Sequence, residues 1–288
     1  WLHMASAVSV APHGIRAVTA ALDGSSAVVE VSTALTGTAD SVTYELADAE
    51  GQVLATAEGL GTVQLAANGI TPWTPETPAL YTLRVNVTAN GTADTAEQRI
   101  GIRTIQVSSK TGLLLNGQPR TMKGGCIHHD LGILGAADHA AAERRRIRLM
   151  KESGFDAIRA AHNPFGPAFL NACDELGMLV VEEAFDEWVM GRTSFGLHVT
   201  FEQCWEKDLE DMITRDYNHP CIVMWSTGNE VEERDGTADG FAWAKRLADK
   251  VRSLDASRPV SATACALFSE YGNRPAGGTT GNQALNMA

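Results

Sequence analysis

The sequence predicts two parts, an antiparallel β-sandwich followed by part of a (β/α)8 barrel. Short alternating strands separated by turn residues fill about the first hundred positions, which is the pattern of a sandwich. From about residue 120 the pattern changes to repeating units of strand, loop and helix, which indicates a parallel sheet. We assign residues 1–109 to the sandwich and residues 110–288 to the barrel portion.

The sandwich strands are recognised by alternation of apolar and polar residues. They are expected at residues 27–35, 42–46, 53–57, 62–66 and 80–87. Residues 101–105 and 113–117 lead out of the sandwich. The second of these segments ends in Asn116-Gly117, a pair typical of tight hairpins.

The barrel portion shows five strands and four helices in alternation. Strands are expected at 121–127, 155–160, 178–181, 221–225 and 259–264, and helices at 138–153, 167–176, 201–217 and 240–254. Asp138 is the expected N-cap of the first helix, and Gly154 and Gly177 stop the first two helices.

Two features qualify the barrel assignment. An open doubly wound sheet is the rival fold, but it usually carries a glycine-rich phosphate loop after its first strand, and residues 123–126 do not match one. A complete barrel needs ~250 residues. About five units are recognisable here, so we expect the chain to hold only the first part of a barrel.

Composition narrows the classes of partner and compartment. A formal net charge of −12 argues against nucleic acid and anionic membranes. No apolar run approaches the ~20 residues that span a bilayer. The five cysteines are scattered without C-x-x-C spacing, which favours a reducing, cytoplasmic compartment over disulfides or a zinc site.

Polar side chains cluster where the predicted parallel strands end. These are residues 128–130, 159–163, 182–188 and 229–230. The carboxyl ends of parallel strands meet at one face, where barrel enzymes have their active sites. Carboxylates, imidazoles, an arginine and a tryptophan around one mouth suit a neutral, hydroxyl-rich ligand such as a sugar.

Several motifs in order resemble family 2 glycoside hydrolases, which include β-galactosidases, β-glucuronidases and β-mannosidases. Residues 218–230 resemble the acid/base signature of that family. Residues 73–83 resemble the Trp-x-Pro-Glu-x-Pro-x-Leu-Tyr motif of its immunoglobulin-like domain. Residues 101–105 and 115–119 resemble the junction, and residues 123–130 and 159–164 the first two barrel strands. The resemblance therefore implies that the sandwich is immunoglobulin-like.

The resemblance also implies roles for individual residues. Glu230 would be the catalytic acid/base. The substrate-binding residues would be Asn229, Arg159, His162, Asn163, His128, Asp186 and Trp188. His129 and Asp130 are weaker candidates, because alternation along a strand sends neighbours to opposite sides. Trp188 has a second interpretation, in which it packs beneath a long loop.

The implied reaction needs a second carboxylate as nucleophile, which the family carries on its seventh barrel strand. No position of this chain clearly matches it, and Glu270 follows Glu230 by too few units. We therefore expect a fragment of a retaining exo-β-glycosidase, first a β-galactosidase, with β-glucuronidase or β-mannosidase as alternatives. This chain alone should be nearly or wholly inactive.

Other classes and cofactors stay open on the sequence. The chain could instead be a non-catalytic carbohydrate-binding remnant or a piece of a larger assembly, including a homo-oligomer. The chemistry requires no cofactor. Glu187 aligns with a magnesium ligand of some β-galactosidases, but Val189 stands where those enzymes have a histidine, which weakens the expectation of a metal.

Overall fold

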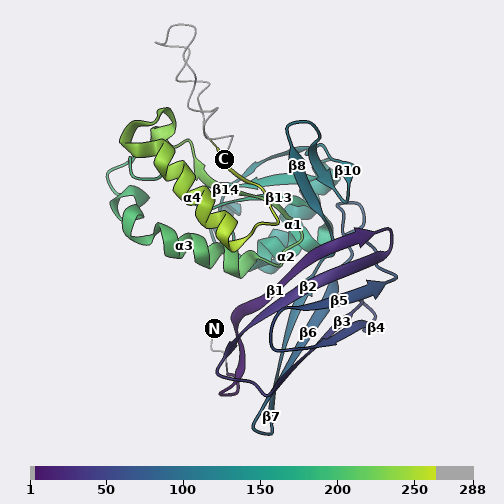
Figure 1. Cartoon of the computed structure of the whole chain (residues 1–288). Coiled ribbons are helices and arrows are strands. Elements are labelled where there is room, and N and C mark those ends of the chain that lie inside the picture. The colour runs from purple at the N-terminus through teal and green to yellow at the C-terminus, as the bar shows by residue number, and fades with distance from the viewer. Residues whose placement is uncertain (1–3, 264–288) are drawn as a thin grey trace. The chain divides into compact units, whose positions relative to one another are not determined.

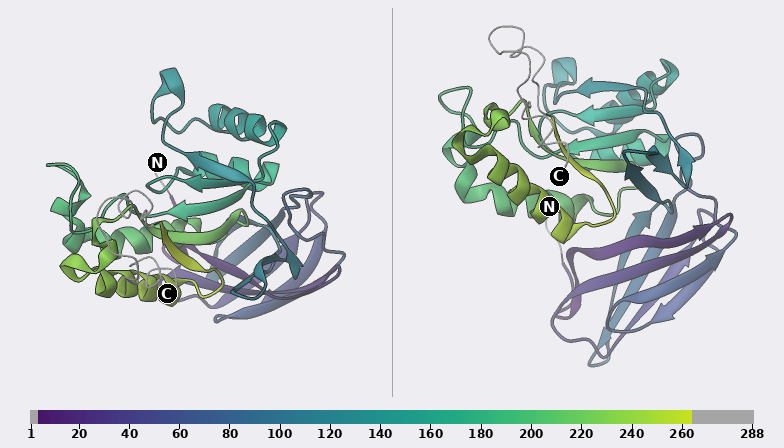
Figure 2. Two further views of the ribbon diagram at one scale, coloured as in Figure 1. Left: turned by 90° about the horizontal axis from the view of Figure 1, so that it is seen from above. Right: turned by 45° about the horizontal axis from the view of Figure 1, so that its top comes forward.

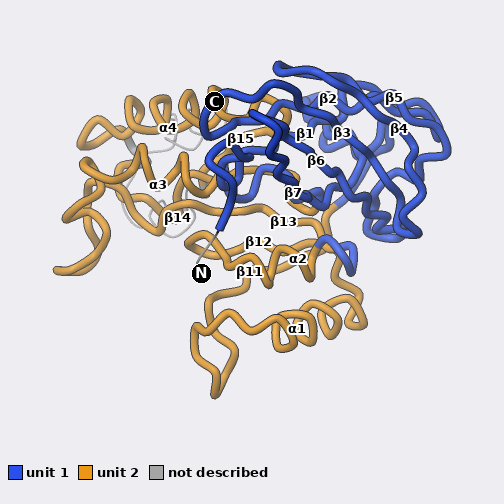
Figure 3. The backbone as a smooth tube through the Cα atoms, turned by 90° about the horizontal axis from the view of Figure 1, so that it is seen from below, with its two compact units in different colours: residues 1–121, 174–177, 214–220 blue, residues 122–173, 178–213, 221–288 orange. Residues whose placement is uncertain are grey.

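A computed structural model describes residues 4–263 of the chain. Its elements fall into two compact units, coloured separately in Figure 3. Unit 1 holds residues 1–121 with the segments 174–177 and 214–220, and unit 2 holds the rest. The domain boundary between residues 109 and 110 stays a prediction. No helix in the described part of the chain is long and apolar enough to cross a membrane.

Unit 1 is a β-sandwich. One sheet has the order β1-β2-β5 and the other β4-β3-β6-β7, and all pairs are antiparallel (Figure 1). The strands are β1 (Ser9–Asp23), β2 (Ser26–Thr36), β3 (Ser41–Ala47), β4 (Val53–Glu58), β5 (Val63–Asn68), β6 (Tyr81–Ala89) and β7 (Thr92–Ile100). Alternate residues of β3 and β6 are buried, as expected for strands with one face on a core.

A small antiparallel sheet follows the sandwich. It has the order β10-β9-β8 and consists of β8 (Ile105–Ser108), β9 (Gly112–Leu115) and β10 (Gln118–Pro119). Asn116 and Gly117 join β9 to β10 with positive φ angles of 52° and 74°. This is the conformation that an Asn-Gly hairpin turn requires, and the prediction made for this pair is confirmed.

Unit 2 contains one parallel sheet of five strands in chain order, as in a (β/α)8 barrel (Figure 2). The strands are β11 (Gly124–Ile127), β12 (Ala157–Ala160), β13 (Leu179–Glu183), β14 (Ile222–Asn229) and β15 (Val260–Thr263). The helices are α1 (Ala140–Glu152), α2 (Pro167–Leu176), α3 (Phe201–Asp216) and α4 (Gly240–Leu254), with short turns η1 (Gly132–Leu134), η2 (Leu197–Val199), η3 (Glu232–Asp235) and η4 (Thr237–Asp239). The fold class predicted from the sequence is confirmed.

Three local expectations were wrong or incomplete. Asp138 does not cap α1, whose N-cap His139 makes no side-chain cap bond. The Asp138 carboxylate instead accepts a hydrogen bond, at 3.2 Å, from the backbone N–H of Ala168 in the first turn of α2. The fourth barrel strand does not end at Trp225 but runs on to Asn229. The sequence pattern also missed β1 and β7.

Candidate active site

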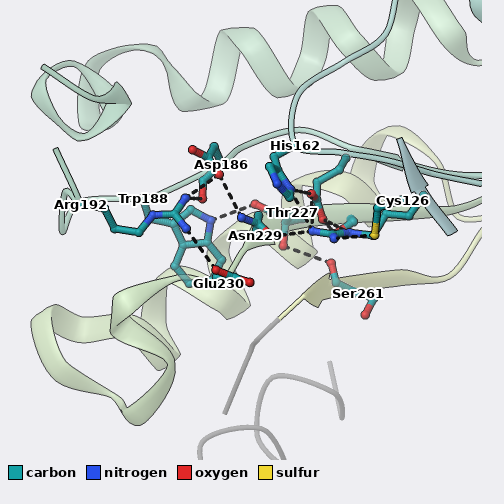
Figure 4. Close-up of polar contacts among 12 residues, drawn as sticks. Cys126, His162, Asp186, Trp188, Arg192, Thr227, Asn229, Glu230 and Ser261 are labelled. Atoms are coloured by element: carbon teal, nitrogen blue, oxygen red, sulfur yellow. Dashed lines mark hydrogen bonds and ion pairs between the residues drawn. The ribbon is translucent and has the colours of Figure 1, made fainter. Parts of the chain in front are cut away.

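The carboxyl ends of three neighbouring strands bring predicted polar residues together within unit 2 (Figure 4). Arg159 and His162 come from β12 and the residues after it, Glu183 from the last position of β13, and Asn229 from the last position of β14. Because the strands are parallel, these ends lie on one edge of the sheet, although the pairing of β13 with β14 shifts register once between Val180 and Val181.

Glu183 is a fully buried carboxylate that joins three of these strand ends. Its Oε1 accepts from Arg159 Nη2 at 2.7 Å, and its Oε2 accepts from Arg159 Nε at 3.1 Å. Ser226 Oγ donates to Oε2 at 2.7 Å, and His162 Nδ1 lies 3.2 Å from Oε1. Burial alone would lower the pKa of Arg159, but the charge and hydrogen bonds of Glu183 raise it. The Arg159 guanidinium is therefore held by both oxygens of Glu183 in a two-pronged geometry.

Asn229 is buried, and its amide is oriented by partners on both sides. Arg159 Nη2 donates to its Oδ1 at 2.6 Å, and its Nδ2 donates to Asp186 Oδ1 at 2.9 Å. A donor at one end and an acceptor at the other define which atom is oxygen and which is nitrogen. Arg159 thus links Asn229 to Glu183, while Asp186 links it to the loop after β13.

Glu230, directly after β14, carries an exposed carboxylate at this edge. Its side chain is 54% exposed, whereas that of Glu183 is 0% exposed. The backbone of Glu230 has a positive φ of 45°, which few non-glycine residues adopt. Arg192 Nη1 lies 3.5 Å from Glu230 Oε2. The carboxylate is therefore open to an incoming molecule and is contacted by a cation on one side.

The loop between β13 and α3 is organised around the buried carboxylate of Glu187. Its Oε2 accepts the backbone N–H of Arg192 at 2.9 Å, and its Oε1 accepts from the backbone N and Nδ1 of His198 at 3.1 and 3.0 Å. Burial would raise the pKa of Glu187, but these donors together lower it. A side chain at Gly196 would place its Cβ 1.8 Å from Glu187 Oε1, so the loop needs glycine there.

The environment of Glu187 does not fit a magnesium ligand. Both of its oxygens already accept N–H groups, and Val189 offers no ligand atom two residues on. In the described part of the chain, no cluster of three candidate ligand side chains includes Glu187 or Glu230. Mg²⁺ prefers oxygen ligands that are free to coordinate it, so we assign no metal to this loop.

The other predicted site residues differ in exposure. His128 is exposed and lies edge-on to His162, with ring centroids 4.8 Å apart. Asn163 is also exposed. Trp188 is fully buried, and its indole N–H donates to the Thr227 carbonyl at 2.8 Å. Its ring therefore packs against β14 and does not present a face for stacking on a sugar.

His129 lies apart from this group. It stacks on Phe165 with ring centroids 4.0 Å apart, and its Nε2 lies 3.3 Å from the Pro164 carbonyl oxygen. Burial lowers the pKa of His129. Glu270 lies outside the described residues.

Two residues of the site were not predicted from the sequence. Arg192 contacts Asp186 and Glu230, and Ser226 donates to Glu183. Arg192 follows a glycine in an irregular loop, where no periodicity marks a side chain as facing a site. Ser226 sits in β14, and only the extension of that strand beyond Trp225 places its hydroxyl beside Glu183.

Comparison with known proteins identifies the family. The model described as "Glycosyl hydrolases family 2, TIM barrel domain" matches residues 105–271, and the model "Glycosyl hydrolases family 2" matches residues 14–103. The chain belongs to glycosyl hydrolase family 2.

Relatives and solved structures agree with this assignment. The chain is 34% identical to "Beta-galactosidase BoGH2A" of Bacteroides ovatus, over 91% of this chain and 36% of the relative. It is 31% identical to a beta-glucuronidase of Paenibacillus borealis, over 85% of this chain and 42% of the relative. A family 2 member from Bacteroides cellulosilyticus superposes with a TM-score of 0.85 at 34% identity, covering 90% of this chain and 36% of that one. The chain thus spans well under half the length of these relatives.

Proposed function

We propose that this chain is the first part of a retaining exo-β-glycosidase that removes terminal β-linked sugars, with β-galactosides as the first candidate substrates. The observation that carries the proposal is the pair at the end of β14. Asn229 is oriented by Arg159 and Asp186, and Glu230 beside it is an exposed carboxyl group. The names of the relatives support β-galactosides, and also β-glucuronides as the alternative.

The roles follow from the chemistry of retaining hydrolysis. Two carboxyl groups about 5–5.5 Å apart act on opposite sides of the scissile bond. Glu230 would protonate the glycosidic oxygen while a second carboxylate attacks the anomeric carbon. Glu230 would then take a proton from the water that releases the sugar. Asn229 Nδ2 and Oδ1 would hydrogen-bond a sugar hydroxyl next to the anomeric carbon.

The attacking carboxylate is not supplied by the acidic residues described around Glu230. Glu183 is fully buried against Arg159 and Ser226, and we assign Asp186 to orienting Asn229 and Arg192, which both donate to its Oδ1. A nucleophile needs an oxygen that can reach the substrate. We therefore propose that the nucleophile lies in a part of the barrel outside residues 1–288, and that these residues alone are nearly or wholly inactive.

The test is a panel of aryl β-galactosides, β-glucuronides and β-mannosides with the complete gene product that carries these residues. Glu230→Gln should lower kcat/KM for substrates with poor leaving groups by about 10²–10⁴-fold, the usual contribution of general acid–base catalysis. Glu202→Gln, an exposed glutamate of α3, is the matched control and should leave the rate unchanged.

Four results would contradict the proposal or a part of it. Wild-type rates in Glu230→Gln would remove Glu230 from the reaction. A product released with inverted configuration, observed by proton NMR at early times, would exclude the retaining mechanism. Turnover by residues 1–288 alone that Glu230→Gln abolishes would show that the nucleophile is already present. Glycan binding by the complete gene product without any hydrolysis would instead favour a carbohydrate-binding protein.

A further inference from the structure

The contacts of Glu230 point to a residue that no sequence motif identifies. In the part of the chain that the structure describes, Arg192 is the one cationic side chain within 4.0 Å of the Glu230 carboxylate. The contact is made by Nη1 to Oε2 at 3.5 Å. The other oxygen, Oε1, is left to face an incoming group. The guanidinium is 26% exposed, so it lies partly out of solvent, where such a contact is screened less than on an open surface.

Arg192 is itself held at its other end. Its Nη2 donates to Asp186 Oδ1 at 2.5 Å and to the Asp186 carbonyl oxygen at 2.7 Å. Asp186 Oδ1 also accepts from Asn229 Nδ2. Asp186 is therefore connected to both of the consecutive residues Asn229 and Glu230. It binds the Asn229 amide directly, and it is linked to Glu230 through the Arg192 guanidinium, as Figure 4 shows.

The backbone of Arg192 is anchored as well. Its N–H donates to Glu187, the buried carboxylate on which the loop is built. One residue before, a Cβ at Gly191 would lie 2.0 Å from His198 Nδ1, so the chain passes too close to His198 for any side chain at that position. A long flexible arginine side chain costs entropy to order. Here both its backbone and its head group are fixed before any ligand binds.

We propose that Arg192 is a positioning residue for Glu230, an inference that rests on the proposed glycosidase function. Arg192 holds Oε2 and so directs Oε1 at the glycosidic oxygen. In the first step the proton leaves Oε1 for the leaving-group oxygen, while the C1–O bond breaks and the nucleophile bonds to C1. In the second step the water oxygen bonds to C1, its proton goes to Oε1, and the nucleophile leaves.

The same guanidinium has a second role in the proposed reaction, because it places a cation beside Glu230. A cation beside an acid/base carboxylate compensates charge when that group is ionised between the two steps. Arg192 supplies a permanent positive charge from the chain itself, since guanidinium does not lose its proton in proteins. The loop at Glu187, whose oxygens are occupied by N–H groups, then has the task of holding Arg192 and not that of binding a metal ion.

The kinetic test uses Arg192→Met in the complete gene product with aryl glycosides of graded leaving groups. A poor leaving group needs a well-aimed proton, whereas dinitrophenolate departs without one. We expect kcat/KM to fall about 10–100-fold for poor leaving groups and less than about 3-fold for the dinitrophenyl glycoside, with KM nearly constant. Arg148→Met removes an exposed arginine of α1 and is the matched control.

Arg192→Lys provides the conservative comparison. A lysine keeps the charge but cannot contact Asp186 and Glu230 at once as a planar fork does. Its selectivity between leaving groups should therefore lie between wild type and Arg192→Met. An equal loss of rate for all leaving groups would show that Arg192 is merely structural. No loss for any of them would also overturn the proposal.

A second measurement does not depend on turnover. The position of the Glu230 carboxylate is compared between crystal structures of the wild-type and Arg192→Met gene products. Productive geometry is held within about 0.5 Å, so a larger displacement in the variant supports the proposal, and an unmoved carboxylate overturns it. If the wild-type protein hydrolyses none of the glycosides, the proposed function fails by that result, and the structural comparison still decides whether Arg192 positions Glu230.

Discussion

Glu183 keeps a carboxylate at a position with no solvent exposure, and its neighbours explain how. Arg159 and Ser226 donate to it, so the charge is paired and hydrogen-bonded. Removing one partner of a buried pair leaves the other charge uncompensated. Glu183→Gln should therefore lower the free energy of unfolding by about 3 kcal/mol, the lower part of the usual range, because Arg159 is 19% exposed.

Urea unfolding followed by tryptophan fluorescence measures this loss. Glu30→Gln, an exposed strand glutamate, is the control and should change stability by less than about 0.5 kcal/mol. A Glu183→Gln midpoint equal to that of wild type would show that the buried pair adds no stability over its neutral counterpart.

At the scale of single residues, the sequence predicted which residues at strand ends belong to the site better than it predicted which loop residues do. Arg159, His162 and Asn229 follow strands with clear apolar patterns, so their common edge could be inferred before the structure. Arg192 lies in a loop whose path depends on N–H groups meeting Glu187, which is a tertiary arrangement with no local signal. The burial of Trp188 likewise depends on β14, which lies behind it.

At the scale of secondary-structure elements, the side chain of Asp255 holds together the connection between α4 and β15. Its Oδ2 accepts from Arg258 and from Trp225 of β14, and its Oδ1 accepts from Ser257. Burial would raise the pKa of Asp255, but these partners, Arg258 first, lower it from 3.8 to about 2. Because the folded-state pKa is depressed, the stabilisation is complete above the unfolded pKa and is lost as the pH falls from about 4 to about 2.

This gives a pH-dependent prediction for Asp255→Asn. The difference in unfolding free energy between wild type and variant should shrink by about 2 kcal/mol between pH ~5 and pH ~2, by proton linkage. Asp249→Asn, on the exposed face of α4, is the matched control for the loss of an aspartate carboxylate. Urea unfolding of wild type and variant at a series of pH values measures this difference. A difference in unfolding free energy that stays constant with pH would show that the linkage is absent.

The elements missed by sequence pattern share a physical cause. In β7 one face is largely exposed, so the strand carries few large apolar residues to mark it. In β1 the register shifts between Val10 and Ile15, around Pro12 and Gly14, which breaks the alternation. Asp138 has the sequence of a helix cap but serves a neighbouring helix. The apolar alternation thus locates strands with one regular apolar face, but it did not locate β1, β7 or the role of Asp138 in α2.

At the scale of the whole molecule, the fold class could be predicted because every level of the pattern agreed. Alternating strands, then five βα units in order, leave little choice of architecture. The order of the parallel strands then follows from the chain order.

The last prediction concerns the unpaired strands of the parallel sheet. Among the described residues, β11 pairs with β12 alone and β15 with β14 alone. Unpaired N–H and C=O groups of an edge strand recruit other strands. Residues 1–288 produced by themselves should therefore associate with rising concentration, as measured by size-exclusion chromatography with light scattering.

Gly125→Lys in β11 should reduce this association, because a lysine on an edge strand disfavours the addition of another strand. The substitution is sterically possible, since nothing lies within 4 Å of a Cβ placed at residue 125. Gly61→Lys, equally unobstructed but remote from that sheet, should not reduce the association. A monomer at all concentrations with sharp cooperative unfolding would show that these edges are already covered.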